Sequence, residues 1–363
     1  MQQVNRLREL DFLRGIAIIL VLFRHQLLFR FLETMGWIGV DLFFVLSGFL
    51  VSGLLFKEYQ KFGSINAKLF LIRRGFKIYP IFYLTYILYI IPSVLLHKFD
   101  LEKTFYDLIF VQNYALGWGY AYAASWSLAV EEHFYFALAL FLWLIFNKKI
   151  MSFEYKENQF SNFEKLLFFI LILILGLRIF SNIYFPDENV RNTTMSHLRI
   201  DSLLFGVLIA YWYYFKFDKL SDFYQKYKAA LLILAFAMLS FTPFIEQLES
   251  FFIRTIGFTM LYLSFGIILI HFLIDKSVNA QINRLFTRTI VNFISKIGFC
   301  SYSIYVIHSF VINWIGFFKP IKNRFLAFAI VFSISVIAGF IMTNVIEKFI
   351  LNLRNKYFPN RIN

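Results

Sequence analysis

Residues 11–31 read DFLRGIAIILVLFRHQLLFRF, an apolar block interrupted by Arg14, Arg24 and His25. A mostly apolar stretch of about 20 residues is long enough to cross the roughly 30 Å hydrocarbon core of a bilayer as one helix. The apolar region of a cleavable signal peptide is shorter, about 7–15 residues. We therefore expect this block to be the first membrane-spanning helix of the chain.

Similar apolar blocks recur along the whole chain. Of its 363 residues, 60% are hydrophobic and 16% are charged, whereas soluble domains average about 25% charged residues. This composition argues against a soluble enzyme, a disordered protein and a disulfide scaffold. It predicts an all-α, polytopic integral membrane helical bundle with about ten transmembrane helices. The expected spans are residues 11–31, 37–56, 78–96, 125–146, 166–184, 198–215, 229–245, 251–274, 298–316 and 325–346.

The distribution of basic residues predicts the orientation of the chain. The formal net charge is +14, and cytoplasmic loops of membrane proteins are enriched in Lys and Arg. With a cytoplasmic N-terminus, the inner segments hold 24 Lys and Arg residues and the outer segments hold seven, of which Lys319, Lys322 and Arg324 share one loop. We therefore expect both termini in the cytoplasm, a single transmembrane domain over residues 1–350 and a short basic cytoplasmic tail over 351–363.

Two classes of partner are not expected. The basic residues lie between apolar blocks and form no surface interleaved with aromatic residues, so we expect no nucleic-acid partner. The only cysteine, Cys300, cannot form an internal disulfide. It has no metal-ligating neighbours of suitable spacing, so we expect no metal site.

Ionisable residues inside the spans are candidates for function, because each costs about 2.5–3.5 kcal/mol to insert. Arg14 and His25 are eleven residues apart, which places them on one helix face about 16 Å apart. Glu131, in the inward-running fourth span, is expected at the same depth as His25, about 10 Å below the outer surface. A carboxylate at this depth can orient an imidazole base. We therefore expect His25 and Glu131 to form a catalytic pair.

Other polar residues are expected near the outer half of the bundle. Asp41, Arg199 and Asp201 fall in outer-facing turns, and His308 lies nearer the middle of the ninth span. Each is interpreted in two ways that stay open, as part of an ion pair between helices or as a group that binds an acceptor. Trp126, like Trp118 and Tyr120, is placed to stack on a sugar ring or to pack between helices. Glu132 points about 100° away from Glu131 and is expected to be structural.

The inner face has a different character. Arg73, Arg74 and Lys77 precede Tyr79-Pro80 at the cytoplasmic start of the third span. Together with Arg14 they could form a cationic pocket for a phosphorylated cofactor. They could equally be basic anchors at the membrane surface.

These residues carry a resemblance that covers nearly the whole chain. The sequence resembles the membrane-bound acyltransferase 3 family, and the family's motifs occur along it in the usual order. The matching segments are Arg8 to Ala17 with His25, Gly39 to Phe49, Arg73-Arg74 through Tyr79-Pro80, Ser125 to Leu128 with Glu131 and Phe134-Tyr135, Arg199 to Asp201 with Gly206, and Ser301 to Tyr305 with His308. Two positions depart from the pattern, because Phe12 stands where a glycine is common and Lys77 replaces the usual arginine.

The resemblance implies a bacterial integral-membrane O-acyltransferase of the multi-pass inner (cytoplasmic) membrane. It implies that acyl-CoA, most simply acetyl-CoA, is the donor and that a hydroxyl of an extracytoplasmic or lipid-linked carbohydrate, such as O-antigen, capsule or exopolysaccharide, is the acceptor. By the same resemblance, Arg14 and His25 match the family's functional Arg/His pair and Arg73 and Arg74 its inner-face arginine motif. Glu131 matches the acidic residue of the Trp-Ser-Leu segment.

A second hypothesis is a polytopic transporter or flippase. His25, Glu131, Arg199 and His308 would then form a relay for protons or substrate inside the membrane. About ten spans suit such a protein, whereas the cationic inner cluster suits an acyltransferase better. Binding of acyl-CoA discriminates the two hypotheses.

Overall fold

The computed structural model describes residues 8–25, 28–151, 153, 161–318 and 323–362. Within these ranges every regular element is a helix and no strand occurs, which confirms the predicted all-α class. The helices are α1 Arg8–Arg24, α2 Arg30–Met35, α3 Ile38–Phe62, α4 Ala67–Leu95, α5 Leu101–Leu108, α6 Gln112–Ala115, η1 Ala123–Ser125, α7 Trp126–Phe146, α8 Asn162–Tyr184, α9 Asn189–Thr194, α10 Ser196–Arg199, α11 Asp201–Phe215, α12 Phe217–Leu239, η2 Ile253–Gly257, α13 Phe258–Ile274, α14 Val278–Phe299, α15 Ser301–Phe318, α16 Arg324–Ile341, η3 Met342–Glu347 and α17 Lys348–Tyr357.

The number of long apolar helices is smaller than the ten expected spans. In the described ranges six helices are long and apolar enough to cross a membrane, or seven if the bent pair of α14 and α15 is one span. The axes of that pair differ by 79°. Helices lie in each of the ten expected blocks, but α11 has only 15 residues.

Two of the expected spans differ from the helices. The block 11–31 is divided between two helices: α1 ends at Arg24 and α2 begins at Arg30, and residues 26–27 lie outside the described ranges. The block 229–245 is only part of α12, which starts at Phe217 with a charged, amphipathic half and ends at Leu239. An amphipathic beginning suits a membrane surface better than its interior.

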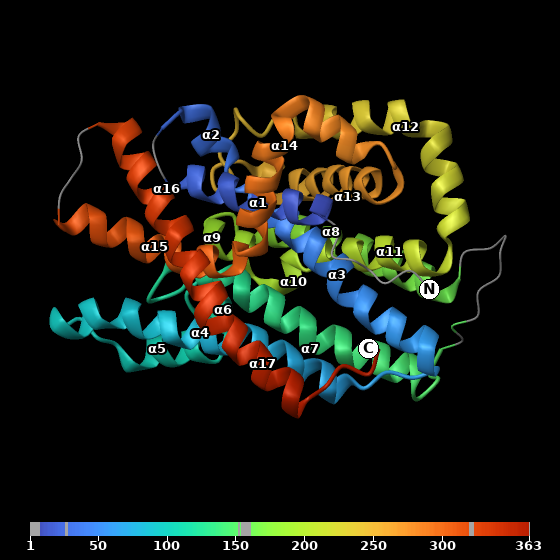
Figure 1. The fold of residues 1–363 in the computed structure, drawn as a ribbon, viewed down its shortest axis with the longest axis horizontal. Coiled ribbons are helices and arrows are strands. Elements are labelled where there is room, and N and C mark those ends of the chain that lie inside the picture. The colour runs from blue at the N-terminus through green and yellow to red at the C-terminus, as the bar shows by residue number, and fades with distance from the viewer. Residues whose placement is uncertain (1–7, 26–27, 152, 154–160, 319–322, 363) are drawn as a thin grey trace.

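Connections that were expected on opposite sides of the membrane lie at opposite ends of the bundle. In Figure 1 the C-terminal ends of α3 and α7 lie together at the right, whereas α5 lies at the left. The backbone N–H of Ile65, in the turn from α3 to α4, donates to Asn147 Oδ1 at 3.1 Å, which ties this turn to the end of α7. The outer loop that contains Lys319 and Lys322 lies outside the described residues.

Helix α3 runs through the centre of the bundle and packs closely against α11. A Cβ on Gly48 would collide with the carbonyl oxygen of Leu203, and a Cβ on Gly206 would collide with that of Val45. The two glycines therefore let the backbones of α3 and α11 touch, as small residues commonly do between membrane helices. This close contact fixes the depth of the polar residues that α3 carries.

The C-terminal segment is packed against the bundle and is not a loose tail. Helix α17 covers much of the segment that was expected to be a short basic tail. Beyond it, Arg361 forms an ion pair with Glu58 of α3 at 2.6 Å, and the ring of Phe358 lies 5.5 Å from that of Phe76 in α4. The segment 351–362 thus packs against the helices that flank the α3–α4 turn, at the end of the bundle that was expected to face the cytoplasm.

Candidate functional site

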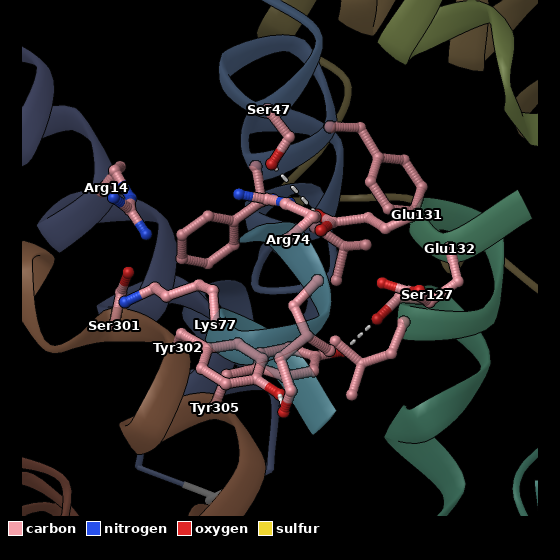
Figure 2. A pocket seen from close by; sticks show the side chains of 15 residues that line it. Arg14, Ser47, Arg74, Lys77, Ser127, Glu131, Glu132, Ser301, Tyr302 and Tyr305 are labelled. Atoms are coloured by element: carbon pink, nitrogen blue, oxygen red, sulfur yellow. Dashed lines mark hydrogen bonds between the residues drawn. The ribbon is translucent and has the colours of Figure 1, made fainter. Parts of the chain in front are cut away.

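A polar cavity of about 120 Å³ lies between α1, α3, α4, α7 and α15. Figure 2 shows Arg14 and Lys77 on one side of it and Glu131 and Glu132 on the other. Three helices, α1, α4 and α7, therefore bring these two basic and two acidic side chains together. Arg74 is the fifth charged residue of the lining. We call this the inner cavity.

A chain of hydrogen bonds fixes the acidic side of the inner cavity. Glu131 accepts hydrogen bonds from Ser47 Oγ at 3.1 Å and from the hydroxyl of Tyr135, which lies one helical turn further along α7. The guanidinium of Arg74 donates to the same Tyr135 hydroxyl and lies 4.2 Å from the centre of its ring. Tyr135 thereby links an arginine of α4 to a carboxylate of α7.

The other charged residues of the inner cavity also have partners. Lys77 forms an ion pair with Glu347 of the π-helical turn η3. Glu132 accepts a hydrogen bond from the hydroxyl of Tyr79 at 2.8 Å. Glu132 was expected to be only structural, but it lines the cavity beside Glu131. Arg74, Lys77, Glu131 and Glu132 are thus each held by a residue of another helix.

Arg73 lies apart from the other three basic residues that were predicted to bind the donor. Its guanidinium donates to the carbonyl oxygen of Phe358 and to Asn355 Oδ1, the latter at 3.2 Å. Successive residues of a helix point about 100° apart, so Arg73 faces the C-terminal segment while Arg74 faces the cavity. Arg354 donates to the same Asn355 oxygen at 3.0 Å and joins Arg73 at the inner end of the bundle.

A second, larger cavity of about 510 Å³ contains His25 and lies toward the side of the bundle that was expected to face outward. Three tryptophans line it, Trp37, Trp118 and Trp126, together with Arg199. Its other charged lining residues are Arg24, Glu33, Glu246 and Glu249. Both guanidinium nitrogens of Arg24 lie 2.9 Å from the carboxylate of Glu246, a bidentate pair that fixes the helix end next to His25. We call this the outer cavity.

The ring next to His25 is that of His308. The two ring centres are 5.2 Å apart. His308 is fully buried, its Nδ1–H donates to the carbonyl oxygen of Tyr305, and its Nε2 lies 3.1 Å from Ser309 Oγ. The carbonyl can only accept, so this bond fixes the Nδ1–H tautomer of a neutral His308. His308 is therefore held in one orientation beside His25.

Glu131 is bound elsewhere than the sequence-based pairing with His25 requires. Its two oxygens accept from Ser47 and Tyr135 and face the inner cavity, whereas His25 faces the outer one. Equal depth along two helices does not fix the rotation of either helix about its axis. Instead of forming a pair, Glu131 lines the inner cavity and His25 lines the outer cavity.

The candidate acceptor-binding residues fall into two groups. Trp126 and Arg199 line the outer cavity. Asp41 and Asp201 are fully buried in ion pairs, Asp41 with Arg199 at 2.8 Å and Asp201 with Arg178 at 2.7 Å. The buried carboxylate of Asp41 holds the arginine that reaches the outer cavity. The ion-pair interpretation therefore applies to Asp41, Arg199 and Asp201, whereas acceptor binding stays a prediction.

Comparison with known proteins gives the family. The sequence profile of the acyltransferase 3 family, described as an acyltransferase domain, matches residues 7–344. The chain belongs to this family. The resemblance inferred from the motifs is confirmed.

Relatives of this acyltransferase 3 protein are named as O-acetyltransferases. The peptidoglycan O-acetyltransferase OatA of Listeria monocytogenes is 28% identical over 326 residues, which cover 83% of this chain and 48% of the relative. A protein of Staphylococcus aureus (strain COL), whose name describes it as a candidate O-acetyltransferase, is 28% identical over 334 residues, 84% of this chain and 50% of its own length. The chain thus spans about half the length of these curated relatives. No solved structure gives a significant match.

Sequence reasoning missed several residues of the two cavities. Ser47, Ser127 and Tyr305 lie inside the acyltransferase 3 motifs but carry no charge that would single them out. Tyr135 follows Glu131 by one helical turn, a spacing that places both on one helix face. Nothing in the sequence singled out Glu246 as a cavity residue, because it lies just after the end of the expected span 229–245.

Proposed function

We propose that this acyltransferase 3 protein is a bacterial inner-membrane enzyme that transfers an acetyl group from cytoplasmic acetyl-CoA to a hydroxyl of an extracytoplasmic or lipid-linked carbohydrate. One observation carries the proposal. A cavity lined by cationic groups and a cavity lined by a histidine and three tryptophans adjoin, because Val40 and Tyr305 line both of them. Such an arrangement suits two substrates that arrive from opposite faces of the membrane.

The donor binds at the inner cavity in this proposal. Arg14, Arg74 and Lys77 supply positive charge for the phosphates of CoA, and arginine matches phosphate oxygens with two parallel hydrogen bonds. Arg73 adds to this charge from the rim, beside the C-terminal segment. Glu131 keeps Arg74 in place through Tyr135 and is a positioning residue. The rise of helix α1 separates Arg14 from His25 by about 16 Å, a distance that an extended pantetheine arm spans.

The acceptor binds in the outer cavity, where the tryptophan rings offer flat apolar faces for sugar rings. His25 acts as general base. It takes the proton of the acceptor hydroxyl while that oxygen attacks the thioester carbonyl. The carbon–sulfur bond of acetyl-CoA then breaks, and His25 returns the proton to the departing thiolate, so the products are an acetyl ester and CoA with a free thiol.

The cavity and the relatives support the proposed class of acceptor. The name of the Listeria relative gives peptidoglycan as the polymer on which that protein acts. For this chain we propose a cell-surface carbohydrate, a class that includes peptidoglycan strands, O-antigen, capsule and exopolysaccharide. Trp126 and Arg199 are the acceptor-binding residues, Asp41 and Asp201 support them through buried ion pairs, and His308 positions His25.

The test uses inside-out vesicles of the native membrane, which carry the natural acceptor and expose the cytoplasmic face. Radiolabelled acetyl-CoA is added, and the label that enters the vesicle glycan is measured. His25→Ala should lower incorporation by about 10²- to 10⁴-fold, the range expected for loss of a general base. Binding of acetyl-CoA to this variant should stay as in the wild type.

The matched control is His97→Asn, a change of an exposed histidine in the turn after α4. Asparagine tolerates the positive φ of 55° at this position. This variant should incorporate label at the wild-type rate. Incorporation by His25→Ala at that same rate would remove His25 from the mechanism. A wild-type protein that binds no acetyl-CoA would instead favour the transporter hypothesis.

A further inference from the structure

Two residues separate the inner cavity from the outer cavity. Val40 of α3 and Tyr305 of α15 line both of them. The basic residues Arg14, Arg74 and Lys77 line only the inner cavity, and His25 lines only the outer one. We call the pair Val40 and Tyr305 the partition. In the proposed function, the route from the basic residues to His25 leads past these two residues, because both cavities share them.

Hydrogen bonds to η1 and α7 hold the tyrosine of the partition in place. The Tyr305 hydroxyl lies 2.6 Å from Ser127 Oγ and donates to the carbonyl oxygen of Ala124 at 3.0 Å. Figure 2 shows Tyr305 and Ser127 joined across the cavity, from α15 to α7. The tyrosine ring also lies edge-on to Phe43, with ring centres 6.4 Å apart. Both polar partners are neutral, so no ion pair has to break when the ring moves.

The partition lies directly before the histidines. The ring centre of Tyr305 is 5.5 Å from that of His308, which in turn is 5.2 Å from that of His25. A carbonyl group that has just passed Tyr305 therefore enters the outer cavity beside these rings. The acyl group leads the thioester sulfur on this path, so it is the first part of the donor that must fit between Val40 and Tyr305.

From this geometry we propose that Val40 and Tyr305 form the constriction through which the acyl group passes, and that the space between them sets the largest acyl group the protein transfers. The inference rests on the proposed function, because it assumes a donor on the inner side and an acceptor on the outer side. Tyr305 opens by releasing Ser127 and Ala124, and Val40 is the fixed side of the passage. Both are specificity-determining residues that act before the bond-forming step.

Two substitutions of Val40 test the proposal in opposite directions. In the vesicle assay with labelled acetyl-CoA and butyryl-CoA, Val40→Ala should widen the passage and raise the ratio of butyryl to acetyl incorporation about tenfold, since one or two methylene groups in a fitted pocket change rates by this order. Val40→Phe should narrow it and lower acetyl incorporation about tenfold or more. The dissociation constant for acetyl-CoA should stay within about twofold in both variants, because the basic residues are unchanged.

The control for added bulk is Leu54→Phe, which enlarges a side chain on the outward-facing surface of the same helix, where Leu54 is 49% exposed. It should leave both rates unchanged. Val40→Ala only removes volume, so it keeps the proposal testable if Val40→Phe does not fold. An unchanged butyryl-to-acetyl ratio in Val40→Ala overturns the partition proposal while the enzyme still transfers acetyl groups. A wild-type protein that transfers neither group overturns the proposed function itself.

Discussion

Asp107 shows how one buried residue organises the loop that covers the outer side. Its carboxylate accepts hydrogen bonds from the backbone N–H groups of Tyr120 and Ala121, at 3.0 and 2.9 Å, and from the Tyr86 hydroxyl at 3.0 Å. It is fully buried in α5, outside the long membrane helices. Burial raises the pKa of the Asp107 carboxyl, and the two N–H groups offset only part of that rise.

This pKa predicts a pH-dependent stability. Because the folded protein binds the Asp107 proton more tightly than the unfolded chain does, stability falls as the pH rises from about 3.9 through the raised folded pKa. Asp107→Asn removes this titration. It also turns an NH₂ group toward a backbone N–H donor, which should cost about 1–3 kcal/mol of unfolding free energy. The melting temperature of the wild type should exceed that of the variant, and the difference should widen as the pH is lowered from 7 to 4.

Thermal unfolding of both proteins in detergent at several pH values checks this expectation. Other titrating groups are shared by the two proteins, so they cancel in the difference between the melting temperatures. A difference that narrows toward pH 4 would contradict a raised pKa for Asp107 in the folded protein.

At the residue scale the sequence predicted which polar groups lie in the bundle better than it predicted their partners. Arg14, Lys77 and Glu131 do line one cavity, and His25 lies in another. Depth along a helix follows from residue number, but rotation about the helix axis depends on packing against all neighbours. For this reason the His25–Glu131 pair could not be tested from the sequence alone, and neither could the pairing of His25 with His308.

At the scale of helices, the contact between α3 and α11 is the feature most sensitive to added volume. We predict that Gly48→Ala lowers the unfolding free energy by about 1–3 kcal/mol, because the new methyl group meets the fixed carbonyl oxygen of Leu203 and forces the backbones apart. The control is Gly176→Ala in α8, where an added Cβ meets nothing within 4 Å. Since alanine favours helix over glycine, the control should be unchanged or slightly more stable. Thermal unfolding in detergent measures both, and equal melting temperatures would contradict the packing argument.

The predicted span bounds agree with the observed helix bounds where an apolar block has polar or turn-forming residues at its ends. The expected span 125–146 agrees with η1 and α7, which end at Phe146. The block 229–245 did not predict α12, because its charged first half was assigned to a loop although it continues the same helix. The kink between α14 and α15 was equally hidden, since a change of direction leaves no mark on hydropathy.

At the scale of the whole molecule, the orientation in the membrane can be tested with the cysteine content of the chain. Cys300 is the only cysteine in the sequence and is buried, so single engineered cysteines report their own exposure. Lys98→Cys should react with a membrane-impermeant maleimide in intact spheroplasts. Lys68→Cys and Lys356→Cys should react only after the membrane is opened, because the charge bias predicts that the α3–α4 turn and the C-terminal segment face the cytoplasm.

The unsubstituted protein is the background control for this labelling. Reaction of Lys356→Cys in intact spheroplasts would overturn the cytoplasmic placement of the C-terminus. Reaction of Lys68→Cys under the same conditions would reverse the orientation of the bundle.

The overall class of the molecule was accessible from the sequence because composition and charge bias are sums over many residues. The existence of two cavities was not, since it depends on where the side chains that line them, among them Val40 and Tyr305, lie in space. Both residues lie inside the acyltransferase 3 motifs, but the motifs do not indicate that they line two cavities.

The wall formed by Val40 and Tyr305 has a consequence for the cell as well as for the reaction. A polar passage that stayed open from one face to the other would carry water and, along it, hydrogen ions down their electrochemical gradient. With the tyrosine hydroxyl bound to Ser127 and Ala124, we expect the resting protein to keep the two cavities apart. In the proposed function, the membrane then stays insulating between turnovers, and the energy stored across it is not lost through an idle enzyme.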